Sequence, residues 1–282
     1  MEIGRIAVLG AGQMGAGIAQ VASCAGFQVV MIDIEQEYID RGIKNIEKSL
    51  LKLVSKHKMS QEEANIAMSL VSTSTSREAA ADADLVIEAI PEVIGLKTSA
   101  FKDLDEICKE TAILATNTSS ISINELAAST RRPDRVIGMH FMNPVPIMKL
   151  IEVINGSDTL PEVTDAVLQL SEKLGKIPLQ CNDSPGFISN RILCPMLNEA
   201  ILALQEGVAT PEAIDGIMKL GMNHPIGPLA LADLIGLDTV LHIMNVLREG
   251  LEDEKYAPAE LLVSMVSEGR LGRKTGEGFY SY

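Results

Sequence analysis

Short apolar runs separated by longer stretches mark the first two thirds of this sequence. The runs occupy residues 5–9, 29–32, 85–89, 112–116 and 136–139. Helix-like segments connect several of them, and strands that alternate with helices are typical of a parallel sheet with helices on its faces. We therefore predict an α/β fold with a mostly parallel sheet for this part of the chain.

The pattern changes at residues 183–186, Asp-Ser-Pro-Gly. Long helical patterns follow at 187–205, 211–220, 229–248 and 258–267, with no strand pattern among them. Thr210 is placed to cap the second of these helices, and a Pro at the first helical position costs no hydrogen bond. We expect a sheet-containing domain over 1–183 and an all-helical domain over 184–282.

A run of lysines lies between the second and third apolar runs. On a helix these side chains share one face, opposite the apolar residues of the same segment. Ser60 and Glu63 form the pattern of a capping box that begins a second helix. The sequence thus predicts a helical hairpin over about 38–70. The cationic face fits either a solvated surface or an anionic ligand. The four lysines are Lys44, Lys48, Lys52 and Lys56.

Composition excludes several classes of protein. The 24 Lys+Arg against 38 Asp+Glu give a net charge of −14, which argues against nucleic acid and anionic membranes as partners. No apolar run approaches the roughly 20 residues of a membrane span. The four cysteines are too sparse for a disulfide framework and lack a Cys-x-x-Cys metal motif, so we expect a cytoplasmic protein without a metal site.

A Gly-x-Gly-x-x-Gly motif stands between the first apolar run and the first helical segment. Gly10 permits a tight turn, Gly12 lets a pyrophosphate approach the backbone, and Gly15 allows close packing of helix on strand. The amides around Gln13 and Met14 would face the anion at the helix N-terminus. This context predicts a dinucleotide-binding fold of Rossmann type, although the glycines could also serve only to shape a turn.

Asp33 ends the second apolar run. A carboxylate at this position can accept hydrogen bonds from the ribose hydroxyls and repels a 2′-phosphate, so we expect NAD rather than NADP. A solvated strand end is the alternative reading of Asp33.

A histidine and a glutamate occupy two neighbouring apolar runs. His140 ends the first run, and Glu152 interrupts the run at 150–154. If the two segments fold back about Pro146, His140 falls opposite Glu152, with the side chains roughly 5 Å apart. An imidazole oriented by a carboxylate is a general acid/base unit. A core histidine bonded to a carbonyl, beside an exposed glutamate, remains the alternative.

With these residues in place, the whole chain resembles the L-3-hydroxyacyl-CoA dehydrogenase family, and within it most closely the bacterial 3-hydroxybutyryl-CoA dehydrogenases. Several separate motifs in one order carry the resemblance. They are the Gly-rich motif at 10–15, Asn117-Thr118-Ser119-Ser120, the segment 140–146, Pro185-Gly186-Phe187 with Asn190-Arg191, and the segment 272–280.

The resemblance implies NAD(H)-dependent interconversion of (3S)-3-hydroxybutyryl-CoA and acetoacetyl-CoA, in a homo-oligomer formed through the C-terminal helical domain. His140 would be the acid/base and Glu152 its orienting carboxylate, while Ser119 and Asn190 would hold the oxygens of the substrate. The implied contacts of the cofactor's ribose and nicotinamide end are Glu92, Lys97, Ser119, Asn143 and Lys274. The implied contacts of CoA are Ser49, Lys56 and Ser119.

Structural roles compete with some of these assignments. Ser119 could instead cap a helix that starts near Ile123, and Asn190 could be an exposed surface residue. Glu92 and Lys97 could form an ordinary charge pair on a helix surface. The sequence alone also leaves open whether Lys44, Lys48 and Lys52 contact CoA phosphates.

Two rival functions fit the same fold. One is a non-catalytic dinucleotide-binding protein, such as the lens crystallins that resemble this family. The other is a β-hydroxyacid dehydrogenase that acts on free acids with a catalytic lysine. An NADH assay that compares acetoacetate with its CoA thioester separates these two functions from that of a 3-hydroxyacyl-CoA dehydrogenase.

Overall fold

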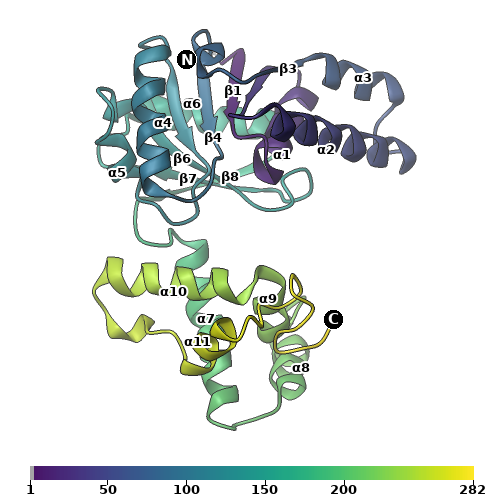
Figure 1. The fold of residues 1–282 in the computed structure, drawn as a ribbon, viewed down its shortest axis with the longest axis vertical. Helices are drawn as coiled ribbons and strands as arrows, with labels where there is room; N and C mark the ends of the chain where they lie inside the picture. The colour runs from purple at the N-terminus through teal and green to yellow at the C-terminus, as the bar shows by residue number, and fades with distance from the viewer. Residues whose placement is uncertain (1–2) are drawn as a thin grey trace. The chain divides into compact units, whose positions relative to one another are not determined.

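The computed structural model describes residues 3–282, which form two compact units that meet in the sequence between Asp183 and Ser184. The first unit contains a single eight-stranded sheet in the order β3-β2-β1-β4-β5-β6-β7-β8 (Figure 1). The strands are β1 (Arg5–Leu9), β2 (Gln28–Ile32), β3 (Val71–Ser74), β4 (Leu85–Glu88), β5 (Ile113–Thr116), β6 (Val136–Phe141), β7 (Leu150–Asn155) and β8 (Ile177–Asn182).

Every neighbouring pair of strands is parallel except β6 and β7, which form an antiparallel hairpin. The predicted mostly parallel sheet is therefore confirmed. The strands β1, β4 and β5 read as continuous apolar runs because both faces of a central parallel sheet are buried.

The two strands that the apolar pattern did not reveal lie at the edges of the sheet. The edge strand β3 consists of Val-Ser-Thr-Ser, and all six residues of β8 are exposed or half-buried. An edge strand buries less of its surface than a central strand and so needs no apolar run. This explains why hydrophobicity located the interior of the sheet but not its borders.

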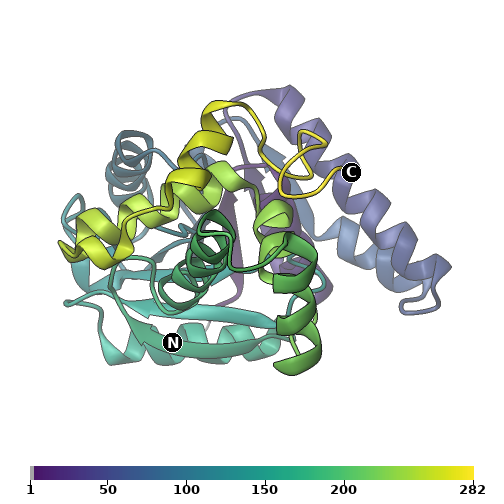
Figure 2. The ribbon, with the colours of Figure 1, turned by 90° about the horizontal axis from the view of Figure 1, so that it is seen from below.

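Helices cover the sheet and extend beyond it. They are α1 (Gln13–Cys24), α2 (Gln36–Ser55), α3 (Gln61–Ser69), α4 (Ile94–Ile107), α5 (Ile123–Ala127) and α6 (Pro161–Lys173), with the 3₁₀ turns η1 (Arg77–Ala80) and η2 (Pro133–Arg135). The predicted hairpin consists of α2 and α3, which Figure 2 shows side by side and running away from the sheet. Its capping box is present, since Ser60 Oγ accepts from Glu63 N at 3.1 Å and Ser60 N donates to Glu63 Oε2 at 2.7 Å.

The second unit, Ser184–Tyr282, is helical, as predicted. Its central helix α7 contacts α9, α10 and α11 (Figure 1). Thr210 caps α8 by accepting from Ala213 N at 3.3 Å, as expected. The elements are α7 (Ser189–Gln205), α8 (Pro211–Gly221), α9 (Pro228–Ile235), α10 (Leu237–Leu251), the 3₁₀ turn η3 (Glu254–Tyr256) and α11 (Glu260–Ser267).

The single helix expected over 229–248 is wrong, because Gly236 divides it into α9 and α10. Gly236 has φ 103°, a left-handed value that ends a right-handed helix, and the two helices are bent by 96°. The helix expected from residue 187 begins instead at Ser189, since Gly186 and Phe187 also have positive φ. Within residues 3–282, no single helix passes a length and hydropathy test for a membrane span; only α9 and α10 taken together do.

Candidate active site

The three glycines of the Gly-rich loop meet different surroundings between β1 and α1. A Cβ on Gly10, whose φ is 109°, would lie 2.5 Å from Ala89 O, and one on Gly15 would lie 1.8 Å from Gly10 O. Both positions therefore exclude any side chain. A Cβ on Gly12 would meet nothing within 4 Å, so the space next to this residue is open.

The N-terminus of α1 opens onto this space. Gly12 is its N-cap, and no side chain caps the helix. Exposed amides at a helix start, together with the helix dipole, form a site for an anion such as a pyrophosphate. The residues present thus fit a bound dinucleotide, with Gln13 and Met14 in the first turn of the helix.

Asp33 follows β2 and is tied to the same loop. Its Oδ2 accepts from Ala11 N at 2.6 Å, and its Oδ1 accepts from Ile34 N at 2.8 Å. The residue remains partly exposed. Because each carboxylate oxygen has a second lone pair, Asp33 can still accept hydrogen bonds from ribose hydroxyls.

His140 and Glu152 lie directly opposite each other on β6 and β7, the register expected from a turn about Pro146. The two side chains meet, with Nδ1 of His140 donating to Glu152 Oε2 at 2.8 Å. The exposed fractions are 6% for His140 and 4% for Glu152. Because a carboxylate can only accept, the pairing fixes a hydrogen on Nδ1 and leaves Nε2 for proton transfer.

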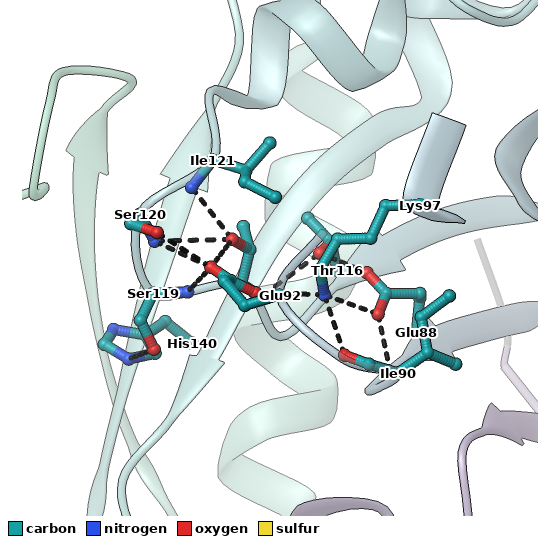
Figure 3. A network of polar contacts seen from close by, with 10 residues as sticks. Glu88, Ile90, Glu92, Lys97, Thr116, Ser119, Ser120, Ile121 and His140 are labelled. Carbon is teal, nitrogen blue, oxygen red and sulfur yellow. Dashed lines mark hydrogen bonds and ion pairs between the residues drawn. The ribbon is translucent and has the colours of Figure 1, made fainter. Parts of the chain in front are cut away.

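Ser119 faces the other nitrogen of this imidazole. It lies just after β5, and its Oγ is 3.1 Å from His140 Nε2 (Figure 3). It does not cap α5, because Ser122 does so by accepting from Glu125 N at 3.3 Å. The alternative reading of Ser119 as a helix cap is therefore wrong, and Glu152, His140 and Ser119 form a continuous hydrogen-bonded row.

A charged network supports the loop that carries Ser119 (Figure 3). Lys97 Nζ on α4 lies 2.6 Å from Glu88 Oε1 and 3.2 Å from Glu92 Oε2, and Lys97 is only 1% exposed. A pair on the helix surface is therefore ruled out for Glu92 and Lys97. Burial raises the pKa of Glu92, but the ammonium of Lys97 and hydroxyls of the loop outweigh it, so the net shift is downward.

A cavity of about 420 Å³ lies between α1, α2 and the turn that joins β6 to β7. Ser49 on α2 lines it, as do Gln13 and Asn143, which bond each other through Nε2 and Oδ1 at 3.0 Å. Lys56 occupies the C-cap position of α2. Its side chain is exposed and does not line this cavity. Of the two predicted CoA contacts in the hairpin, Ser49 lines this cavity and Lys56 does not.

A buried lysine that the sequence did not single out holds the same turn. Lys176 is 9% exposed and donates to the carbonyls of Val145 and Met148. Burial lowers the pKa of this lysine below its ordinary value. A Cβ on Gly17 of α1 would lie 2.8 Å from Val145 Cβ, so the turn packs directly on α1.

Two predicted site residues belong to the second unit. Asn190 lies in the first turn of α7, where its backbone N–H donates to Gly186 O at 3.1 Å. Lys274 lies in the C-terminal segment, and its ammonium pairs with Asp238. Among residues 3–282, no group of three or more His, Cys, Asp and Glu side chains is placed to hold a metal ion.

Family models match both units of the chain. The NAD-binding domain of 3-hydroxyacyl-CoA dehydrogenase matches residues 5–184, and its C-terminal domain matches residues 186–282. The chain belongs to the 3-hydroxyacyl-CoA dehydrogenase family. It is accordingly an NAD-dependent oxidoreductase.

Relatives within the 3-hydroxyacyl-CoA dehydrogenase family match over nearly the full length. A protein of Deinococcus radiodurans named "Probable 3-hydroxybutyryl-CoA dehydrogenase" is 58% identical over 99% of this chain and 100% of its own. The 3-hydroxybutyryl-CoA dehydrogenase of Clostridioides difficile is 51% identical, with 99% of each chain covered. The crystal structure of (S)-3-hydroxybutyryl-CoA dehydrogenase from Ralstonia eutropha has a TM-score of 0.98 and 50% identity, covering 100% of this chain and 99% of that one.

The sequence patterns did not reveal the buried residues behind the candidate site, chiefly Glu88 and Thr116. Glu88 ends the apolar run of β4 just as Asp33 follows that of β2, so the same signal was available. Thr116 offers no such signal, because threonine is common in strands. Lys176 lies among ordinary surface residues in the sequence and is revealed only by its burial.

Proposed function

We propose that this protein interconverts (3S)-3-hydroxybutyryl-CoA and acetoacetyl-CoA with NAD(H), in fatty acid and butanoate metabolism. The row formed by Glu152, His140 and Ser119 carries the proposal, since it supplies a positioned proton carrier beside a hydroxyl that can orient an oxygen. The choice of substrate is supported by the names of the relatives, among which the Ralstonia eutropha enzyme is named for the (S) configuration.

The cofactor would be held by the Gly-rich loop and by Asp33. Gly12, Gln13 and Met14 would receive the pyrophosphate at the start of α1, where Gly10 and Gly15 allow the close packing. Asp33 would accept from the adenosine ribose and disfavour NADP. When bound, NAD(H) supplies or accepts the hydride.

His140 would carry the proton. In the reducing direction the protonated imidazole donates from Nε2 to the ketone oxygen of the substrate, and in the oxidising direction the neutral imidazole removes the hydroxyl proton. Glu152 stabilises the imidazolium and holds the ring in one orientation. Ser119 Oγ, 3.1 Å from Nε2, would fix the position of the same oxygen, and we assign the same task to Asn190.

Direct contact with the ribose and nicotinamide end of the cofactor is proposed for Glu92, Asn143 and Lys274, as well as for Ser119. For Lys97 the surroundings favour an indirect role. Its ammonium bonds Glu88, Glu92 and the carbonyl of Ile90, which accounts for all three of its hydrogens. Lys97 would therefore act by holding Glu92.

The CoA portion would lie along the hairpin. Ser49 borders the cavity between α1 and α2, and Lys56 ends the exposed cationic face of α2. The lysine ammonium groups on this face repel one another, and a phosphate that pairs with them relieves this repulsion. This supports a nucleotide-binding role for the face. The same reasoning extends to Lys44, Lys48 and Lys52.

The second unit is proposed to mediate homo-oligomerisation. It exposes several large apolar side chains, including Ile192 at 66%, Ile217 at 62% and Leu220 at 90%. Exposed apolar residues that form a contiguous patch are typical of association surfaces. Light scattering on the purified protein tests this point, and a monomer would contradict it. We also propose a cytoplasmic location, supported by the sparse, widely spaced cysteines.

The substrate assignment is tested by following NADH absorbance with acetoacetyl-CoA and with free acetoacetate. We expect rapid oxidation of NADH with the thioester and at least about a hundredfold lower kcat/KM with the free acid. Preference for acetoacetate would indicate a dehydrogenase of free hydroxyacids. Binding of NADH without turnover of either compound would indicate a non-catalytic dinucleotide-binding protein.

A further inference from the structure

Two charged side chains that are shielded from solvent lie behind the loop of Ser119. Glu88, at the end of β4, is 0% exposed, and Lys97 on α4 is 1% exposed. Glu88 Oε1 accepts from Lys97 Nζ at 2.6 Å and from Ile90 N at 2.7 Å, while its Oε2 accepts from Thr116 Oγ1 at 2.7 Å. Three groups of the protein thus hold this carboxylate in place.

Lys97 joins this buried carboxylate to a second one nearer the site. Its ammonium lies 3.2 Å from Glu92 Oε2 and donates to Ile90 O at 3.2 Å. Figure 3 shows the chain of contacts from Glu88 through Lys97 to Glu92. Because Lys97 is held from two sides, its ammonium gives Glu92 a fixed anchoring point.

Glu92 in turn forms several hydrogen bonds with the loop that follows β5. Its Oε1 accepts from Ser119 N at 3.0 Å and from Ser120 N at 3.1 Å, and it also bonds the hydroxyls of Ser120 and Thr118. Thr116 supports the loop as well, since its Oγ1 accepts from Thr118 N at 3.1 Å. Both routes start at the same buried carboxylate, that of Glu88.

The loop presents Ser119 Oγ to His140 Nε2 at 3.1 Å. The backbone amide of this same serine is the one that Glu92 holds, so a shift of Glu92 moves the hydroxyl relative to the imidazole. Displacing a catalytic group by about 1 Å can lower a rate by about a hundredfold. The buried pair is therefore coupled to the geometry of the acid/base centre without touching it.

We propose that Glu88 is a positioning residue for Ser119: with Lys97 and Thr116 it fixes Glu92 and the backbone of residues 118–120, and thereby the distance from Ser119 Oγ to His140 Nε2. The inference rests on the proposed function for its kinetic consequence, although the effect on the loop itself does not depend on it. An ion pair excluded from water suits this task, because water and salt screen the attraction between its two charges only weakly. The attraction therefore constrains the positions of both side chains.

Thr116→Val is the mildest probe, since it removes one hydroxyl and keeps the shape of the side chain. We expect kcat for acetoacetyl-CoA reduction at saturating NADH to fall about 10- to 100-fold. KM for NADH should rise less than kcat falls, since Glu92 and Ser119 are also proposed to contact the cofactor. Thr116→Ser restores the hydroxyl and should recover most of the rate. Glu88→Gln should give the larger loss. Equal losses in Thr116→Ser and Thr116→Val would contradict the proposal.

A double-mutant cycle with Ser119→Ala distinguishes an effect of Glu88 on the position of Ser119 from a general loss of structure in the site. The cycle is measured at saturating NADH, so that any effect of Glu92 on cofactor binding does not enter kcat. If Glu88 acts on the chemical step through the Ser119 hydroxyl, then Glu88→Gln lowers kcat by no more than about twofold when that hydroxyl is already absent. Additive losses would overturn the proposal. The matched control is Asp105→Asn, which disrupts another buried ion pair of the same unit, with Arg132, about two helical turns beyond Lys97 on α4. This control should lower stability but not kcat of the folded protein.

Hydrogen exchange at the Ser119 and Ser120 amides gives a readout that needs no turnover. We expect at least about tenfold faster exchange at both amides in Glu88→Gln, and no change there in Asp105→Asn. Unchanged exchange in Glu88→Gln would overturn the inference even in an active enzyme. If the wild type did not reduce acetoacetyl-CoA, the proposed function would fail, while the exchange measurement would still decide the inference.

Discussion

His140 donates from Nδ1 to Glu152 Oε2 at 2.8 Å, across the antiparallel pair of β6 and β7. Directly opposed residues on neighbouring strands hold their side chains on the same face, so the hairpin itself fixes this contact. Because both side chains are buried, the carboxylate offsets the charge that the imidazole gains on protonation. The fold thus supplies an oriented acid/base before any ligand binds.

Removing the negative charge from this pair should impair catalysis more than binding. In Glu152→Gln, the amide no longer stabilises the imidazolium and can turn its NH₂ group toward Nδ1, which favours the wrong tautomer. We expect kcat to fall about 10²- to 10⁴-fold, and KM for NADH to change by less than about threefold. Steady-state kinetics with acetoacetyl-CoA checks this. A kcat close to that of the wild type would contradict the assignment of Glu152.

The glycines of the cofactor loop offer a matched pair of variants. Gly12→Ala places a methyl group in open space, so the fold should keep its thermal midpoint while NADH binding weakens about tenfold or more. Gly15→Ala drives a methyl group onto the Gly10 carbonyl and should destabilise the fold by at least about 1–3 kcal/mol. Thermal unfolding and fluorescence titration with NADH measure the two effects. Unweakened binding in Gly12→Ala would argue against a pyrophosphate at this loop.

Cofactor selectivity should depend on Asp33. Asp33→Asn removes the charge that repels a 2′-phosphate but keeps an oxygen for the Ala11 amide. We expect the ratio of kcat/KM for NADH to that for NADPH to fall about tenfold or more. Parallel assays with the two cofactors test the expectation. An unchanged ratio would mean that selectivity resides elsewhere.

The lowered pKa of Glu92 predicts a specific pH dependence of stability. Burial raises this pKa, but Lys97 and the loop hydroxyls more than compensate, so the folded value lies below the ordinary 4.5. The unfolded state then binds the proton more readily than the folded state does. The contribution of Glu92 to stability is fully present above the unfolded pKa and is lost as the pH falls through the folded pKa. Glu92→Gln lacks this contribution. The difference in unfolding free energy between wild type and Glu92→Gln should therefore shrink on acidification, as urea titrations at several pH values would reveal. A difference that stays constant would contradict the shift.

The sequence predicted those parts of the fold that local patterns determine. The interior strands, the hairpin of α2 and α3, and the register of His140 with Glu152 follow from apolar runs, a capping box and a single turn. The edge strands β3 and β8 were missed because they bury too little surface to need an apolar run. The division at Gly236 was missed because one glycine within an apolar helix pattern is compatible with a continuous helix.

The support behind the site could not be predicted in the same way. Glu88 pairs with Thr116 across parallel strands that are separated by α4, and no turn fixes that register locally. The burial of Lys97 likewise follows from how α4 packs on the sheet, not from the lysine itself. Side chains that depend on contacts between distant segments become visible only in the folded chain.

The decisive comparison is between the wild type and His140→Gln, with NADH binding and NADH oxidation by acetoacetyl-CoA measured on the same samples. The glutamine can keep a hydrogen bond to Glu152 but cannot carry a proton at neutral pH. We predict NADH affinity within about threefold of the wild type and a kcat reduced by at least about 10²-fold. Near-normal turnover in His140→Gln would contradict the proposal that this imidazole moves the proton.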